Sequence, residues 1–115
     1  MRPYPEMVGL VEQLKSKGHT VGMLSNVLPN TAQDIREHGG YDVFDFTVLS
    51  YEVGHNKPET EIYQHALNKL LPLAPDEVVF IDDIERFLVP AQKLGMKTIL
   101  ATNPKQVIDD VHTLL

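Results

Sequence analysis

The chain has 115 residues, of which 43% are hydrophobic and 23% charged, and these proportions are typical of one folded domain and exclude an intrinsically disordered protein. A formal net charge of −6 argues against a general nucleic-acid or membrane-surface binder, because both need a basic face. The absence of cysteine excludes disulfides, thiolate nucleophiles and cysteine-based metal sites. With no signal-peptide-like opening and no membrane-length apolar run, we expect a cytoplasmic protein.

Helix-like and strand-like patterns alternate along the chain. The helical stretches carry apolar residues every three or four positions, and the strands are short runs rich in β-branched and aromatic residues. In chain order we expect a helix at 8–14 ended by Gly18, a strand at 19–25, a helix opening at 29–31 and stopped by Gly39-Gly40, a strand at 44–49, a loop at 50–58, a helix at 59–71, a strand at 77–81, a helix at 87–94 closed by Gly95, a strand at 98–101 and a helix at 104–115. This alternation predicts a single α/β domain, a three-layer sandwich with a mainly parallel sheet.

Polar residues stand just past three of the strand-like runs: Ser25 with Asn26, Lys57, and Asp82 with Asp83. Because the carboxyl ends of parallel strands share one edge of a sheet, we expect these side chains to converge on one anionic ligand and its metal ion.

Each of these residues also has a simpler interpretation. The adjacent carboxylates Asp82 and Asp83 offer the hard oxygen ligands that Mg²⁺ prefers, but Asp83 can instead cap the turn that begins at Ile84. The Ser25 hydroxyl can bind a phosphoryl oxygen, but serine and asparagine are also common turn formers. The Lys57 ammonium can balance phosphate charge, but a solvated loop lysine is the alternative.

The histidines predict no ligand set of their own. They show no His-x-x-x-His pair, so we interpret them as surface residues, with His55 a neighbour of the pocket. They are His19, His38, His55, His65 and His112.

The order and spacing of these clusters are familiar. The runs 22–26, 50–63 and 78–83, the last with 91–98, closely resemble the second, third and fourth motifs of the haloacid dehalogenase-like (HAD) hydrolase superfamily. The resemblance spans nearly the whole chain. It implies a Rossmann-like core that in most members hydrolyses phosphomonoesters, and in a few cleaves carbon–halogen bonds, through a covalent aspartyl intermediate.

The resemblance also implies a role for each matching residue. Ser25, with Asn26, binds the transferring phosphoryl group, and Lys57 steadies the nucleophile and the developing charge. Asp83, helped by Asp82, binds Mg²⁺. These roles imply a small phosphorylated substrate and neither a nucleic acid nor a membrane as partner.

Two departures from the family pattern limit these expectations. The first motif, an Asp-x-Asp that supplies the nucleophile, has no counterpart before Arg2-Pro3-Tyr4-Pro5. We therefore expect a partial core, 1–115, that lacks the first core strand and any cap and is inactive alone. The second departure is Phe87, where relatives often carry a polar residue, and we expect it to weaken the metal site.

The first strand of the family lies between the strands that end at Ser25 and Ile81. Its absence predicts direct pairing of those two strands, a strand donated by another chain, or self-association. The leading functional hypothesis is a Mg²⁺-dependent phosphatase. The alternative is a non-catalytic module that binds phosphate, metal or protein; a receiver-like phosphoacceptor fits less well, because its acids precede its lysine.

Overall fold

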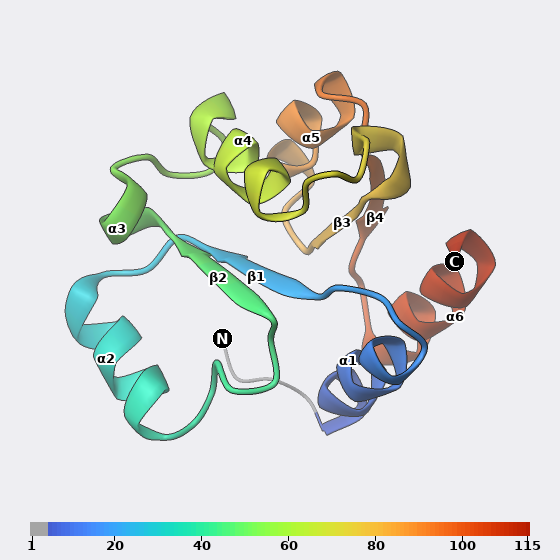
Figure 1. Ribbon diagram of the computed structural model, residues 1–115, viewed down its shortest axis with the longest axis horizontal. Coiled ribbons are helices and arrows are strands. Elements are labelled where there is room, and N and C mark those ends of the chain that lie inside the picture. Colours follow the sequence, from blue (N-terminus) through green and yellow to red (C-terminus); the bar gives the residue numbers. More distant parts are fainter. Residues whose placement is uncertain (1–4) are drawn as a thin grey trace.

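A computed structural model describes residues 5–115 of the chain. Helices and strands alternate along it, as the sequence predicts (Figure 1). In order they are α1 (Pro5–Ser16), β1 (Gly22–Ser25), α2 (Pro29–Glu37), β2 (Phe46–Leu49), α3 (Ser50–Val53), α4 (Thr60–Lys69), η1 (Pro75–Glu77), β3 (Val79–Asp82), η2 (Glu85–Phe87), α5 (Val89–Lys93), β4 (Lys97–Leu100) and α6 (Pro104–Leu114). The predicted α/β fold is confirmed.

Helix α6 shows how local sequence sets an element. The side chain of Asn103 accepts a hydrogen bond from the backbone N–H of Gln106 at 2.9 Å, and Pro104 occupies the first turn, where no N–H is needed. Val107 and Val111, one turn apart, are buried on the inner face. A cap, a compatible proline and one apolar stripe therefore define this helix.

Two elements differ from the prediction. The expected loop at 50–58 opens with the short helix α3, which ends at Gly54 in the left-handed conformation (φ 78°). Four residues are too few to show a helical period, so the pattern could not reveal this helix. The expected helix at 87–94 is divided into the 3-10 turn η2 and helix α5.

The strands form two separate parallel pairs. Strand β1 pairs with β2, with Ser25 opposite Leu49, and β3 pairs with β4, with Asp82 opposite Leu100. Among residues 5–115 no ladder joins β1 to β3. Of the three outcomes expected for the missing first strand, direct pairing of these two strands is therefore wrong, and the strands form two small parallel sheets rather than one, while a donated strand and self-association stay predictions.

Side-chain packing takes the place of that ladder. One hydrophobic cluster lies between the strands and helices α4 and α5, and it contains both Leu24 from β1 and Phe80 from β3. A second cluster joins α1, α6 and β4, and residues flanking or within the strands, Val21 and Ile81, pack against it. Residues from both sheets or directly flanking them pack against each cluster. Side-chain packing therefore holds the two sheets together, and no backbone hydrogen-bond ladder joins β1 to β3 among the described residues.

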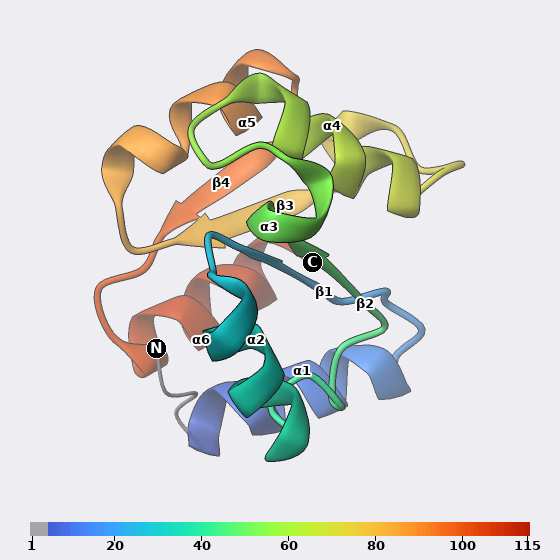
Figure 2. The ribbon, with the colours of Figure 1, turned by 90° about the vertical axis from the view of Figure 1, so that its left-hand side faces the viewer.

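The helices cover both sides of the strands. Helices α4 and α5 lie on one side, and α1, α2 and α6 lie on the other (Figures 1 and 2). This gives the expected three layers. Loops follow the carboxyl ends of β1 and β3. In the described part of the chain, no helix combines the length and apolarity that a bilayer crossing requires.

Candidate functional site

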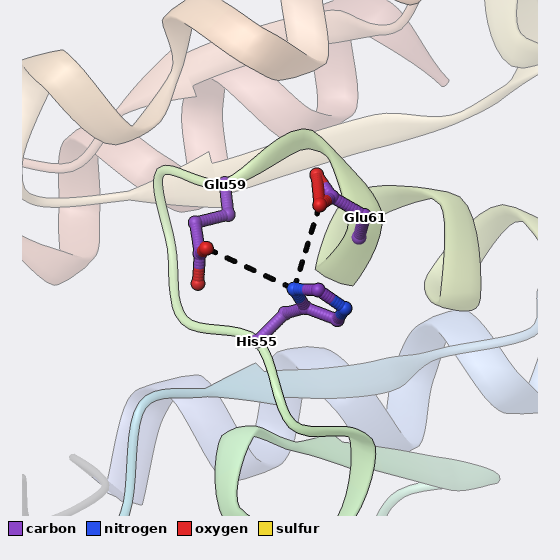
Figure 3. A group of neighbouring side chains, drawn as sticks. All are labelled: His55, Glu59 and Glu61. Carbon is purple, nitrogen blue, oxygen red and sulfur yellow. Dashed lines mark ion pairs between the residues drawn. The ribbon is translucent and has the colours of Figure 1, made fainter.

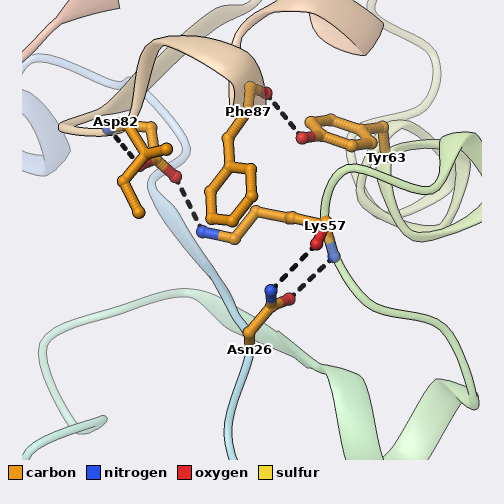
Figure 4. Close-up of polar contacts among 6 residues, drawn as sticks. Asn26, Lys57, Tyr63, Asp82 and Phe87 are labelled. Carbon is orange, nitrogen blue, oxygen red and sulfur yellow. Dashed lines mark hydrogen bonds and ion pairs between the residues drawn. The ribbon is translucent and has the colours of Figure 1, made fainter.

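A nearly buried ion pair lies at the centre of the candidate site. The Nζ atom of Lys57, from the loop before α4, is 2.7 Å from Oδ2 of Asp82 at the end of β3 (Figure 4). The two side chains are only 10% and 7% exposed. The ring centroids of Phe80 and Phe87 are 5.9 and 5.2 Å from the same ammonium. These rings shield the pair from water and add cation–π attraction, so the lysine is not a solvated loop residue.

Asn26 fixes the backbone of Lys57. Its Nδ2 donates to the carbonyl of Lys57 at 3.0 Å, and its Oδ1 accepts from the Lys57 N–H at 2.8 Å (Figure 4). Ser25 is half-buried at the last position of β1, one residue earlier. The end of β1 is thereby tied to the same lysine that reaches β3.

The two adjacent carboxylates have different environments. Asp82 uses Oδ2 for Lys57 and Oδ1 to accept the backbone N–H of Ile84 at 3.0 Å. The turn at Ile84 is therefore capped by Asp82, not by Asp83 as the alternative interpretation had it. Asp83 is exposed, and among residues 5–115 its side chain makes no hydrogen bond or ion pair. One free carboxylate beside a second suits Mg²⁺, which completes its shell with water and phosphate oxygens.

Tyr63 supports one wall of the site. This residue of α4 is fully buried, and its hydroxyl donates to the carbonyl of Phe87 at 2.5 Å (Figure 4). Burial, and secondarily the charge of Asp82, raises the pKa of Tyr63 to about 12. The hydroxyl thus stays protonated and holds the turn that carries the Phe87 ring.

Phe87 packs its side chain against Lys57. Only 8% of it is exposed, and its ring covers Lys57. The sequence identified this position only as a departure from the family pattern. The supporting role of Tyr63 was missed entirely, although a tyrosine on the inner stripe of a helix signals a hydroxyl that needs a partner.

Ser50 is a second residue that the sequence analysis missed. It is 6% exposed, and its Oγ accepts from the Val27 N–H at 2.8 Å and donates to the Val27 carbonyl at 3.1 Å. This pair of bonds fixes the segment that follows Asn26. A pocket of about 240 Å³ opens beside it, lined by Asn26, Val27, Leu28, Ser50 and Asn56.

The predicted site residues therefore fall into two groups. Lys57 contacts both Asn26 and Asp82 directly. Ser25 and Asp83 occupy the neighbouring positions at the ends of β1 and β3, and their side chains make no hydrogen bond or ion pair with the described residues. The segments that end β1 and β3 therefore come together at Lys57, and the roles of these residues in binding phosphate and metal stay predictions.

His55 belongs to a different group of side chains. Its Nδ1 faces the carboxylates of Glu59 and Glu61 (Figure 3). Because the sequence search looked for paired histidines, it did not consider this combination. The other four histidines are exposed, as expected.

Comparison with known proteins places this geometry in a family. The model of the haloacid dehalogenase-like hydrolases matches residues 1–95. The sesquiterpene phosphatase astK of Aspergillus oryzae is 34% identical over 97 residues, which cover 84% of this chain and 49% of that protein. The chain spans about half or less of the length of the curated relatives it matches.

Solved structures give the same answer. A HAD family enzyme of Bacteroides thetaiotaomicron, solved in complex with magnesium and inorganic phosphate, has a TM-score of 0.72 and 31% identity over 83% of this chain and 50% of its own. A protein of Corynebacterium glutamicum has a TM-score of 0.83 and 25% identity over 97% of this chain and 85% of its own. The chain therefore belongs to the haloacid dehalogenase-like hydrolase family.

Proposed function

We propose that this chain provides the phosphate- and magnesium-binding side of a phosphomonoester phosphatase. The observation that carries the proposal is the Lys57–Asp82 pair, which brings the Lys57 ammonium to the end of β3, where Asp82 is followed by the exposed Asp83. The similarity to a phosphatase, and to an enzyme solved with magnesium and phosphate, supports it. The substrate class is a small phosphorylated molecule.

Phosphoryl transfer depends mainly on positioning and charge neutralisation. Lys57 supplies a fixed positive charge for the phosphoryl oxygens, and the Ser25 hydroxyl with the Asn26 backbone N–H donates hydrogen bonds to them. Asp83, assisted by Asp82, would hold Mg²⁺. When bound, the ion would neutralise further charge on the phosphoryl oxygens.

The nucleophile is proposed to come from outside these residues. The sequence contains no Asp-x-Asp, and the acids at this edge are Asp82, already paired, and Asp83. Without a nucleophilic aspartate no covalent intermediate forms, so we infer that the 115 residues alone do not turn over substrate.

The edges of β1 and β3 support a proposal about how the site is completed. Among the described residues neither edge has a strand partner on the side facing the other. Unpaired edges of apolar strands accept extended segments. We propose that a strand from another segment or chain, or a second copy of this chain, pairs there.

The binding part of the proposal is tested by thermal denaturation with Mg²⁺ and inorganic phosphate together. The melting temperature is expected to rise, because ligands that bind only the folded state stabilise it. Asp83→Asn should abolish the rise, while Asp76→Asn, at another exposed aspartate, should keep it. An unchanged melting temperature in the unmodified chain would contradict the proposed pocket.

The catalytic part is tested with an aryl phosphate and Mg²⁺. The chain alone should be silent, and a form extended at its amino end by a strand ending in Asp-x-Asp should be active. Silence of the extended form, despite ligand-induced stabilisation, would favour a non-catalytic binding module instead.

The edge proposal is tested by light scattering over a range of concentrations. If the chain associates with itself, its measured mass should exceed the 13.0 kDa of the monomer. If an added strand completes the sheet instead, the extended form should be monomeric and more stable. A monomer at every concentration that gains no stability from the added strand would rule this arrangement out.

A further inference from the structure

Three potential metal ligands lie close together on the loop that carries Lys57 and on the first turn of α4. The Nδ1 of His55 is 3.8 Å from Oε2 of Glu59 and 3.5 Å from Oε2 of Glu61 (Figure 3). All three ligand atoms lie within 4.8 Å of one another. In the described part of the chain, no other three histidine or acidic side chains gather in this way.

The spacing suits an ion better than direct bonds between the side chains. Distances of 3.5 and 3.8 Å exceed the usual length of an N–H···O hydrogen bond. A tetrahedral Zn²⁺ with bonds near 2.0–2.1 Å places its ligands about 3.4 Å apart. The two separations from His55, 3.5 and 3.8 Å, are therefore close to the ligand spacing of a tetrahedral zinc site.

The surroundings of Glu59 prepare it for this role. Its Oε1 accepts the backbone N–H of Asn56 at 2.7 Å, which leaves Oε2 directed at His55. Such a bond from outside the ligand set orients a coordinating carboxylate. The nearby carboxylate of Glu61 repels Glu59, and a cation between them would relieve that repulsion.

The geometry points to a Zn²⁺-type site at His55, Glu59 and Glu61, separate from the acids at the end of β3. An imidazole with two carboxylates suits Zn²⁺ and similar transition metals, whereas Mg²⁺ prefers oxygen ligands throughout. Three protein ligands leave a fourth position for water.

The site has a structural consequence for its neighbour. Lys57 lies in sequence between ligands His55 and Glu59, so a bound ion would restrain the loop that directs its side chain to Asp82. The effect on phosphate handling rests on the proposed function above, but metal binding itself does not.

Calorimetric titration of the full chain with Zn²⁺ tests this inference. One ion per chain is expected, and His55→Ala and Glu61→Gln should each weaken binding by about tenfold or more. The matched control is His38→Ala, because His38 is also exposed and lies 3.5 Å from a carboxylate, that of Asp34. Circular dichroism checks that each variant is folded.

Two further measurements locate the ion. Co²⁺ in place of Zn²⁺ should give the visible absorption of a tetrahedral site, and Asp83→Asn should leave Zn²⁺ binding unchanged. Absence of binding, equal affinity in His55→Ala, or displacement of Zn²⁺ by excess Mg²⁺ would overturn the inference. Failure of the phosphatase proposal would not overturn the zinc site, because these measurements do not depend on substrate turnover.

Discussion

The ammonium of Lys57 lies 2.7 Å from the carboxylate of Asp82, and both side chains are at least nine-tenths buried. The lysine comes from a loop and the aspartate from the end of β3, 25 positions further along the chain. Folding thus brings two opposite charges from distant segments into an environment with little water.

Removing one member of this pair should destabilise the folded protein. Lys57→Met leaves the Asp82 carboxylate without its partner, and the free energy of unfolding is expected to fall by about 3 kcal/mol. Urea denaturation measures the change. The double variant Lys57→Met/Asp82→Leu should recover part of the loss, since neither charge then remains.

The control for this experiment is Lys105→Met. Lys105 also lies 2.8 Å from an aspartate, Asp109, but these side chains are 87% and 60% exposed. Water screens such a pair, so its loss should leave the free energy of unfolding nearly unchanged. Equal losses for the two lysine variants would show that burial does not govern the Lys57 pair.

The two hydrogen bonds from Asn26 should also be measurable. Asn26→Ala removes both bonds to the Lys57 backbone, and a loss of about 1–2 kcal/mol is expected. Hydrogen exchange at the Lys57 amide should accelerate, because that N–H loses its acceptor. Asn30→Ala provides a comparison, since its side chain makes no hydrogen bond within residues 5–115; faster exchange at Lys57 in that variant would contradict the assignment.

Tyr63 should ionise at about pH 12. Its pKa in the folded protein lies above the unfolded value of about 10, so the proton is held more tightly in the folded state. The stabilisation is complete below about pH 10 and is lost as the pH rises towards 12.

Ultraviolet absorbance of tyrosinate during alkaline titration measures this. Tyr63→Phe should remove the late step, while Tyr51→Phe should leave it in place. A late step that persists in Tyr63→Phe would show that the buried hydroxyl is not its source.

Two glycines should respond to substitution in opposite directions. The ring of Phe46 lies where a β-carbon on Gly22 would be, so Gly22→Val should cost about 1–3 kcal/mol through displacement of that ring. Gly9, inside α1, has open space around its missing side chain, so Gly9→Ala should stabilise by about 0.5–1 kcal/mol. Thermal denaturation of both variants checks the signs, and a gain from Gly22→Val would refute the packing argument.

The sequence revealed those parts of the fold that depend on short-range order. The amphipathic helices, the short strands and the positions of Asn26 and Asp82 at the ends of β1 and β3 follow from local patterns. The pattern cannot show which side-chain oxygen caps a turn, because Asp82 and Asp83 are chemically identical and only the three-dimensional path of the backbone separates them.

Long-range features were harder to predict. The separation of β1 from β3 depends on how Leu24 and Phe80 pack between the helices, and no local period records that. The convergence of His55 with two glutamates depends on how the loop before α4 folds back on itself. Both features arise from tertiary packing rather than from propensity.

Leu24 and Phe80 belong to different sheets and yet share one apolar cluster. If one strand pair unfolds, apolar side chains of the other pair become exposed to water, because residues of both pairs pack against the same cluster. Melting should therefore be a single all-or-none event, in which probes on β2 and on β4 record the same midpoint, even though no backbone bond among the described residues crosses from one pair to the other.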